Sequence, residues 1–420
     1  MTDLREPAPS ARPRPLDRQD ERLREQQGVR GAAGAALGRI RDGDLGPLPV
    51  VIGLIVIWSI FYALNPLFLS SDNLVNISLE SCSVGVIALG IVCVLLVGEI
   101  DLSVGSVSGL ASAIVGVLFV GHHWPLVATV LAAVAAGAVI GFVYSQMYNR
   151  FGMPSFVATL AGLLGFLGLQ LYILGSQGSI NIPFDSGLVT FAQLDFVPRP
   201  LAYVLAALVP VAMFLTGWEI ARARRRAGLT GASLQGLLAR SLASLVVLEV
   251  VVWYLNRTRG VAWMVVLFAG LAAALNYGFT RTRWGRSVFA VGGNREAARR
   301  AGIRVRGVYT SVFVLCSTLA ALGGVLAAAR LGSATQSSGT GDVNLNAIAA
   351  AVIGGTSLFG GRGSAWSALL GILVIQSISS GLTLLNLSSS FRFMITGIVL
   401  AVAVAVDSLA RKSRVSHGRA

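Results

Sequence analysis

The chain has 420 residues, of which 55% are hydrophobic and 12% are charged, and its mean hydropathy is +0.74. Soluble domains carry about 25% charged residues, so this composition excludes an ordinary soluble protein. The formal net charge of +14 does not indicate a nucleic-acid-binding protein, because the arginines gather in short clusters between and after apolar runs. We therefore expect no nucleic-acid partner.

The first 46 residues differ in composition from the rest of the chain. They are rich in Pro, Arg, Asp, Glu and Gly and contain few large apolar side chains, so they cannot bury enough surface to fold. No short apolar core with a small-residue cleavage site follows the charges, which argues against a cleavable signal peptide. We expect 1–46 to be a disordered cytoplasmic tail, 47–411 a membrane domain, and 412–420 a second cytoplasmic tail.

Long apolar runs predict the membrane-spanning helices, since a span needs about 18 or more predominantly apolar residues. The runs of this length are 49–69, 79–98, 102–120, 126–148, 155–175, 201–220, 234–255, 261–279, 309–329, 364–385 and 391–409. The run 345–358 is too short for a straight span and is expected to be a broken or partial one. None of the runs alternates as a membrane β-barrel does. The predicted fold class is an all-α polytopic membrane protein with about 10–12 membrane segments, some of them broken.

Basic residues set the expected orientation in the membrane. Arginines cluster at 222–226 and at 281–306, and the basic residues at 411–419 end the chain, whereas 65–80 and 331–346 contain no Lys or Arg. Because Lys and Arg are enriched in cytoplasmic loops, we expect the three basic clusters to face the cytoplasm. Both termini are then cytoplasmic, in a multi-pass protein of the bacterial inner membrane.

The residue types that are missing restrict the chemistry. Lys412 is the only lysine in the chain, so the Gly-x-x-x-x-Gly-Lys-Ser/Thr motif of an ATP-binding loop is impossible here. Cys82, Cys93 and Cys316 have no metal-ligand spacing. We therefore expect a protein that is not an enzyme, with no catalytic residue, no metal and no cofactor bound by this chain. If ATP drives its function, ATP and Mg lie on a partner subunit.

Two carboxylates interrupt an apolar region at 94–109, VLLVGEIDLSVGSVSG. A carboxylate at the centre of a bilayer costs about 2.5–3.5 kcal/mol on insertion scales. Gly98 can end one helix, and Asp101 can cap the next near Leu102 with Ser103 close by, while Glu99 faces water or a backbone amide. The alternative, which is compatible with the first, is that both carboxylates line a transport path.

A second segment repeats part of this sequence pattern. Gly98-x-x-x-Leu102-x-x-Gly105 matches Gly354-x-x-x-Leu358-x-x-Gly361, which suggests an internal repeat with one helix break in each half.

A short helix is predicted in the basic loop, at 292–304, GGNREAARRAGIR. Asn294 is a good N-cap, Glu296 falls in the first turn and Arg299 in the last turn, as the helix dipole favours. Gly302 suits the left-handed residue that ends a helix. Because a helix of about two turns is marginal in water, it must pack against its own protein or a partner.

Three stretches resemble a known family. Glu296-Ala297-Ala298-x-x-x-Gly302 resembles the EAA-x-x-x-G coupling signature of the permeases of ATP-binding-cassette (ABC) importers. The three stretches of this chain are GEIDLSVGS (98–106), LNAIAAAVIGGTSLFGGRGS (345–364) and GRSVFAVGGNREAARRAGI (285–303). Each is similar to the ribose/xylose-type sugar permeases. The resemblance covers about 50–410. The family also contains branched-chain amino acid permeases, but the IDLSVG and GGTSL segments resemble its sugar branch. Glu99, where ribose-type sequences have Gly, and the region 217–260 resemble the xylose and multiple-sugar branch.

The resemblance implies the permease subunit of an importer for a monosaccharide, most plausibly xylose, that works by alternating access. The implied partners are ABC ATPase subunits, an extracytoplasmic sugar-binding protein, a second permease copy or a close homologue, and the lipid bilayer. The long outer loop 176–200 either meets the binding protein or is an ordinary loop. The expected substrate path comprises Glu99, Asp101, Ser103, Ser106, Asn346, Thr356 and Ser357. The residues expected to couple to the ATPase are Asn294, Glu296, Ala297, Ala298 and Gly302, within the cytoplasmic loop 281–308. The alternative is a proton-coupled secondary sugar transporter that uses Glu99 and Asp101; an intramembrane enzyme lacks any nucleophile–base pair.

The orientation can be tested by thiol labelling. Single cysteines at Arg225, Arg299 and Ser413 should resist a membrane-impermeant thiol reagent in intact cells, because the basic segments stay on the cytoplasmic side. All three should react after the membrane is permeabilised. Rapid labelling of Arg225→Cys and Arg299→Cys in intact cells would reverse the orientation.

Overall fold

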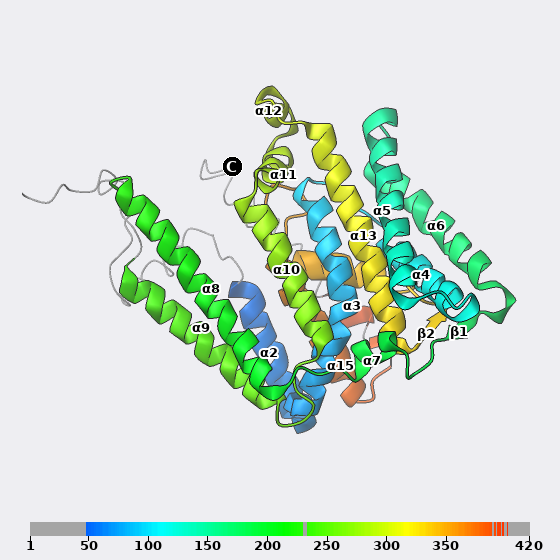
Figure 1. Cartoon of the computed structure of the whole chain (residues 1–420), viewed down its shortest axis with the longest axis horizontal. Helices are drawn as coiled ribbons and strands as arrows, with labels where there is room; N and C mark the ends of the chain where they lie inside the picture. The colour runs from blue at the N-terminus through cyan, green and yellow to red at the C-terminus, as the bar shows by residue number, and fades with distance from the viewer. Residues whose placement is uncertain are drawn as a thin grey trace, which may run out of the picture. The chain divides into compact units, whose positions relative to one another are not determined.

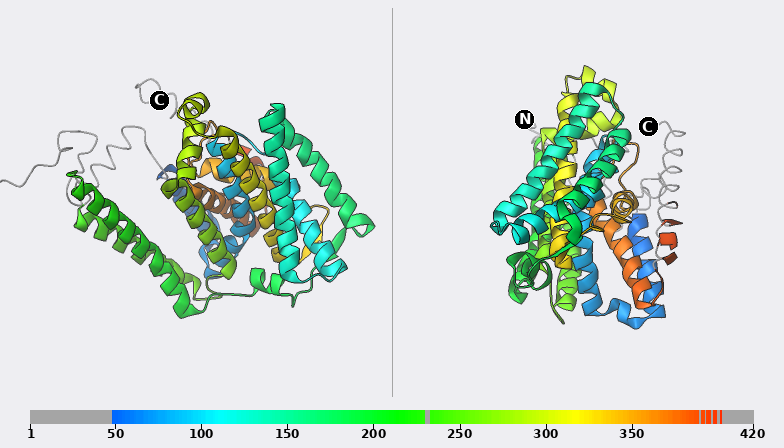
Figure 2. Two further views of the ribbon diagram at one scale, coloured as in Figure 1. Left: turned by 45° about the horizontal axis from the view of Figure 1, so that its top comes forward. Right: turned by 90° about the vertical axis from the view of Figure 1, so that its right-hand side faces the viewer.

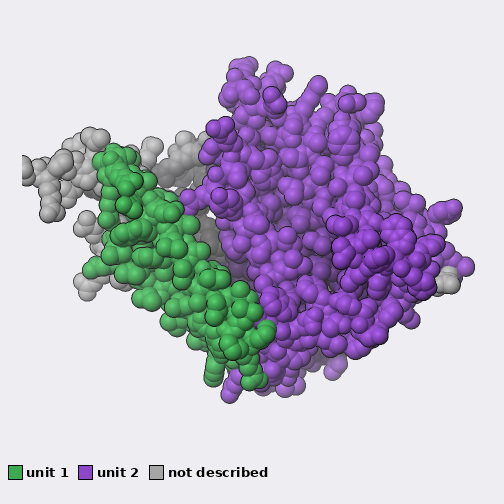
Figure 3. Space-filling view, viewed as in Figure 1, with its two compact units in different colours: residues 1–45, 198–254 green, residues 46–197, 255–420 purple. Residues whose placement is uncertain are grey.

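The structure is a computed structural model of the chain and describes residues 48–229 and 233–388, with 390, 391, 393–395, 397, 398 and 401. The predicted tails 1–46 and 412–420, and most of the predicted span 391–409, lie outside the described residues. The chain divides into two compact units, one formed by 1–45 and 198–254 and the other by 46–197 and 255–420 (Figure 3).

The smaller unit is a helical hairpin. Its helices are α8 (Arg199–Arg226) and α9 (Leu234–Leu255), which match the predicted spans 201–220 and 234–255. Gly217 of α8 faces the side chain of Leu237 of α9, so the two helices pack at this point. The first arginine cluster lies within the end of α8 rather than in a loop. This extension is favourable because cations stabilise the C-terminal end of a helix.

The centre of the larger unit is formed by α3 (Ser71–Leu96) and α13 (Val305–Leu331), the two most deeply buried of the long apolar helices in the described residues (Figure 1). Close packing here depends on small residues. A Cβ atom at Gly90 of α3 would lie 2.7 Å from the carbonyl oxygen of Cys316, and one at Gly324 would lie 2.0 Å from that of Ser108. The backbones of α3, α4 and α13 therefore touch directly.

Other helices surround this pair. On one side, α13 packs against α5 (Leu126–Phe151) and α4 (Val104–Val115), which continues as the π-helix η3 (Gly116–Gly121) and packs against α6 (Ser155–Leu174). On the other side, α3 packs against α10 (Trp263–Arg281), α14 (Val343–Ile353) and α15 (Ala365–Leu384), and α15 also contacts α2 (Leu48–Leu64). Figure 2 shows α3 and α15 side by side in a second view.

The helix count agrees with the predicted fold class. Nine helices in the described residues are long and apolar enough to cross a membrane, and α2 and α14 are shorter apolar helices. This confirms an all-α polytopic membrane protein. The largest difference in boundaries is at α3, which begins at Ser71 rather than at 79, because Ser70 caps it through its side chain (3.3 Å to the Asn73 amide).

A small antiparallel sheet joins the loops that follow α6 and α13. Strand β1 (Ser179–Asn181) pairs with β2 (Ser333–Thr335) in the register Ser179 to Thr335. Short helices η2 (Pro66–Leu69), η4 (Gly175–Gln177) and α7 (Gly187–Gln193) complete this end. The predicted long loop 176–200 is thus partly folded, since it contains β1 and α7.

Candidate functional site

The first break between helices begins with a glycine, as predicted. The α3 helix ends at Leu96, and Gly98 adopts the left-handed conformation with φ +79°. The amide of Gly98 donates to the Leu95 carbonyl (2.9 Å), and that of Glu99 donates to the Val94 carbonyl (3.0 Å). These bonds satisfy carbonyls at the end of α3 that the break would otherwise leave unpaired.

Asp101 is fully buried, but it does not cap the next helix. Its Oδ1 accepts hydrogen bonds from the amide (2.8 Å) and the hydroxyl (2.7 Å) of Ser103. The α4 helix begins at Val104, with Ser103 at the capping position and no side-chain cap. The predicted cap near Leu102 is therefore wrong. An aspartate that bonds the amide two residues onward forms a local turn, and this turn delays the start of the helix.

The rest of the Asp101 site is enclosed by other helices. The amide of Leu102 donates to Thr159 Oγ1 of α6 (3.2 Å), and the thiol of Cys316 of α13 lies beside the carboxyl group. Within the described part of the chain, Asp101 Oδ2 and the hydroxyl of Tyr144 are both buried and make no hydrogen bond. The aspartate is thus closed off from solvent in this conformation, and its two bonds from Ser103 form the turn before α4.

Glu99 lies in a different setting, at the edge of the protein. Its Oε1 accepts a short hydrogen bond from the hydroxyl of Tyr148 of α5 (2.6 Å). This phenol was not among the partners predicted for Glu99, which remains only partly buried. The same hydroxyl accepts from the guanidinium of Arg295 (3.2 Å), and this guanidinium lies 5.4 Å from the ring centre of Tyr309 on α13. The spacing along the sequence contained no signal for either tyrosine.

The short helix α12 (Arg295–Arg300) follows immediately from this contact. Asn294 caps it through a hydrogen bond from the Ala297 amide (2.9 Å), and Gly302 has φ +83° after its end. Ala298 is buried, and the other five residues of the helix are exposed. Glu296 and Arg299 form an exposed ion pair (3.0 Å), which contributes little to stability. The local structure predicted for 294–302 is present, and nearly all of its surface is available to a partner.

The second break follows α14. Gly355 has φ +103°, and Ser364 caps α15 at the amide of Trp366 (3.1 Å). Thr356 and Ser357 are buried, and the amide of Ser357 donates to the Arg362 carbonyl (3.0 Å). The two breaks do not share a backbone conformation, since Gly98 is left-handed and Gly354 is right-handed with φ −68°. The repeated sequence pattern therefore does not correspond to a repeated backbone conformation.

The two breaks meet at a cluster that we call the glycine junction, formed by Gly98, Gly292, Gly360 and Gly361. The amide of Gly361 donates to the Leu96 carbonyl at the end of α3 (2.9 Å). Gly292 lies near the end of α11 (Arg283–Gly293), and a Cβ atom there would lie 1.8 Å from the same carbonyl oxygen. Only two residues separate Gly292 from α12, so the junction places α12 next to both breaks.

The remaining predicted path residues lie in two places. Ser103 and Ser106 are buried at the start of α4, and this start is reached from α14 by Asn344, whose Oδ1 accepts from the Gly105 amide. Asn346 donates to Asp342 Oδ2 (2.9 Å). Thr356 lies ten residues beyond Asn346, or about 15 Å along a helix. The structure therefore brings the α4 and α14 starts together but leaves Thr356 and Ser357 with the glycine junction.

Comparison with known proteins identifies the family. Residues 73–404 match the model described as "Branched-chain amino acid transport system / permease component". The chain is 31% identical to the xylose transport system permease protein of Escherichia coli, over 86% of this chain and 92% of that protein. It is also 31% identical to the ribose import permease proteins of E. coli (85% and 92%) and Bacillus subtilis (87% and 94%).

No solved structure matches the chain significantly. Because the family model covers most of the sequence and the relatives align almost end to end, the chain belongs to this family of ABC-importer permeases. It is a multi-pass membrane protein of an importer and not an enzyme. Permeases of this family work with an ATPase and with a substrate-binding protein.

Asp101 offers a test of the turn. Asp101→Asn should be mild, because an amide oxygen can still accept both bonds from Ser103. Asp101→Ala should lower the free energy of unfolding by about 1–3 kcal/mol, since it leaves those donors unpaired in the interior. Thermal unfolding of the detergent-solubilised protein measures the difference. Equal melting of the two variants would show that the turn does not depend on this carboxylate.

Proposed function

We propose that the chain is the membrane-spanning subunit of an ATP-driven importer for a monosaccharide, xylose or a related sugar. Its amino-acid sequence contains no ATP-binding loop motif. Partner ATPase subunits bind ATP and Mg. The relatives that align over more than four fifths of the chain carry xylose and ribose transport in their names. This agreement supports a sugar over a branched-chain amino acid as the transported solute.

The observation that best supports ATP-driven transport is the connection between α12 and the first break. Arg295, the first residue of α12, contacts Tyr148, and Tyr148 is bonded to Glu99 (2.6 Å). The glycine junction forms a second connection, through the backbone. A displacement of α12 by an ATPase would therefore reach the loop between α3 and α4. Asn294, Glu296, Ala297, Ala298 and Gly302 are the residues that shape the docking helix.

The proposed assembly follows from this arrangement. Two permease copies stand over two ATPase subunits, and the loop 281–308 and both termini face the cytoplasm. An extracytoplasmic sugar-binding protein delivers the sugar at the opposite end, where loop 176–200 lies. Sugar passes between helices whose breaks carry Glu99, Asp101, Ser103, Thr356 and Ser357, and it passes Ser106 of α4 and Asn346 of α14. Buried groups such as Asp101 would be exposed to the path only when the helices rearrange.

Uptake of labelled sugars tests the function. Cells that carry the chain with its ATPase and binding protein should accumulate xylose, and a variant ATPase that cannot hydrolyse ATP should abolish this accumulation. Collapse of the proton gradient at a maintained ATP level should leave it intact. Uptake that persists without the ATPase but stops with the proton gradient would support the proton-coupled alternative.

Tyr148→Phe tests the connection to α12. Phenylalanine keeps the ring that packs on Tyr309 and Arg295 but loses the hydroxyl that joins Glu99 to Arg295. We expect sugar uptake per ATP hydrolysed to fall by about tenfold, which corresponds to one charge-assisted hydrogen bond. Tyr277→Phe, at an exposed position of α10, is the matched control. A normal ratio of sugar uptake to ATP hydrolysis in Tyr148→Phe would show that the Tyr148 hydroxyl does not link α12 to the first break.

A further inference from the structure

A buried amide lies near the end of the mostly apolar helix α6. Gln170 is one turn before the last residue of α6 and is fully buried, whereas its neighbours Leu169 and Leu171 are 41% and 40% exposed. The amide therefore points into the protein. Because burying an amide is costly unless it is hydrogen-bonded, the partners of Gln170 determine what this position does.

In the described residues, the hydrogen-bond partners of Gln170 lie within 335–341, which we call the strap. The strap begins with the last residue of β2 and ends just before the residue that precedes α14. The side-chain Nε2 donates to the carbonyls of Thr335 (3.0 Å), Gln336 (3.3 Å) and Ser338 (2.9 Å). The strap thus takes up both amide hydrogens of Gln170.

The strap runs along one face of α4, beside β2 (Figure 1). This face continues into η3 and consists of small residues at helical spacing, Gly105, Gly109, Ser112 and Gly116. A Cβ atom at the first of these would collide with the Gly339 carbonyl, one at the second with the Ser338 carbonyl, and one at the last with Ala334 of β2. The residue numbers of the strap fall as those of α4 rise, so the two segments are antiparallel and their backbones touch.

Two polar atoms on this face are buried and make no hydrogen bond within the described residues, Gln170 Oε1 and Ser112 Oγ. The first is aimed at α4, because a Cβ atom at Gly109 would collide with it. The second lies on the same face, between the contacts of Gly109 and Gly116. Each buried polar group that stays unpaired costs about 1–3 kcal/mol. Two such groups on one face indicate that this face binds a polar partner in another conformation.

Few interactions hold the strap against α4. Its sequence, TQSSGTG, contains no apolar and no charged side chain, so hydrophobic burial does not anchor it. Its internal backbone bonds are local and move with it. Its bonds to Gln170 and one bond at the end of the sheet, from the Gln336 amide to the Gly178 carbonyl (3.0 Å), would have to open. The strap can therefore leave α4 without unfolding a helix.

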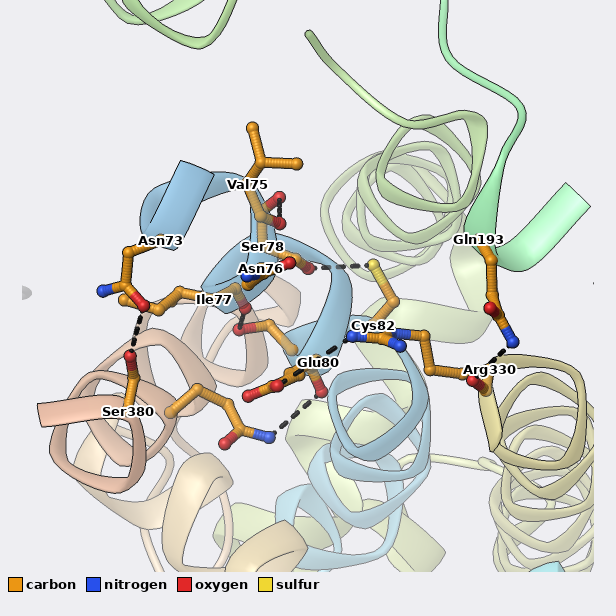
Figure 4. Close-up of polar contacts among 12 residues, drawn as sticks. Asn73, Val75, Asn76, Ile77, Ser78, Glu80, Cys82, Gln193, Arg330 and Ser380 are labelled. Carbon is orange, nitrogen blue, oxygen red and sulfur yellow. Dashed lines mark hydrogen bonds and ion pairs between the residues drawn. The ribbon is translucent and has the colours of Figure 1, made fainter. Parts of the chain in front are cut away.

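The two ends of the strap provide a fixed point and a joint for this movement. Gln193 of α7 donates to the Arg330 carbonyl at the end of α13 (2.9 Å; Figure 4), and β2 pairs with β1. At the other end, Gly341 is exposed and has φ +70°. Because glycine adopts many backbone conformations at little steric cost, the strap can move while α13 and most of the small sheet stay in place.

We propose that Gln170 and Ser112 form a subsite for a neutral polyhydroxylated sugar on α4, and that the strap covers this subsite until the sugar replaces it. Hydroxyl oxygens of the sugar accept the amide hydrogens that the strap carbonyls now accept, and its hydroxyl groups donate to Gln170 Oε1 and Ser112 Oγ. No charged side chain takes part in these contacts, which suits a neutral sugar rather than an amino acid. The inference rests on the proposed sugar import and adds two residues that lie outside the sequence motifs.

Uptake by two variants provides the first test. In cells that carry the complete importer, Ser112→Ala should lower the rate of xylose uptake per permease molecule by about fivefold, and Gln170→Met by about tenfold, since each removes hydrogen bonds to the sugar. Ser112→Ala removes a hydroxyl that is unpaired in the covered state, so its melting temperature should be unchanged or higher. A purely structural role for Ser112 does not predict lower uptake at undiminished stability.

Ser317→Ala is the matched control for these variants. Ser317 of α13 is equally buried, and its hydroxyl also makes no hydrogen bond within the described residues, but it does not face the strap; its uptake should be normal. If the wild type transports neither xylose nor ribose, the proposed function itself fails. If the wild type transports xylose and both Ser112→Ala and Gln170→Met match it, only the subsite fails, as it would if buried water satisfied the two atoms.

Thiol labelling of the purified importer tests the movement of the strap. The three native cysteines are buried, so Ser112→Cys should react slowly at rest and at least severalfold faster when the binding protein and ATP drive turnover. Adding Gln170→Ala should speed the reaction at rest, because the strap loses its hydrogen-bond donor. Ser317→Cys should stay slow in every state. Slow labelling of Ser112→Cys in all states, or equal acceleration of Ser317→Cys, would overturn the proposal.

Discussion

The close approach of backbone segments at the glycine junction determines how the rest of this protein is arranged. The carbonyl of Leu96 ends α3 and accepts the amide of Gly361 (2.9 Å), while the backbone of α11 passes so close that no Cβ atom fits at Gly292. The two helix breaks and the segment that leads into α12 therefore meet at the Leu96 carbonyl. A Cβ atom at Gly292 or Gly360 would force the segments apart, because it would lie 1.8 Å from the Leu96 carbonyl oxygen or 2.8 Å from that of Gly292.

The polar groups near this point show how charges are accommodated in a mostly apolar protein. Asp101 is buried but bonded to Ser103, and Glu99 is bonded to Tyr148. Each bond reduces the cost of placing a carboxylate between spans. The two acids have distinct roles as a result: one fixes the turn before α4, and the other connects that turn to Arg295.

Sequence reasoning was most successful where the information is local. Run length predicted the spans, and Asn294 and Gly302 marked the ends of α12 because caps and left-handed glycines act within a few residues. It failed where partners come from distant helices. Nothing near Glu99 pointed to Tyr148, 49 residues away. Asp101 was assigned to a cap because the same residue type also forms turns, and only the structure separates these two local options.

In the proposed importer, motion of α12 reaches the helix breaks through the glycine junction. Gly292→Ala and Gly293→Ala test it with a built-in control, since a Cβ atom meets Leu96 O at 1.8 Å in the first and nothing within 4 Å in the second. The measurement is sugar imported per ATP hydrolysed by the reconstituted importer, at equal permease abundance. We expect a large loss in Gly292→Ala and a normal ratio in Gly293→Ala. Equal, wild-type ratios in both variants would contradict it.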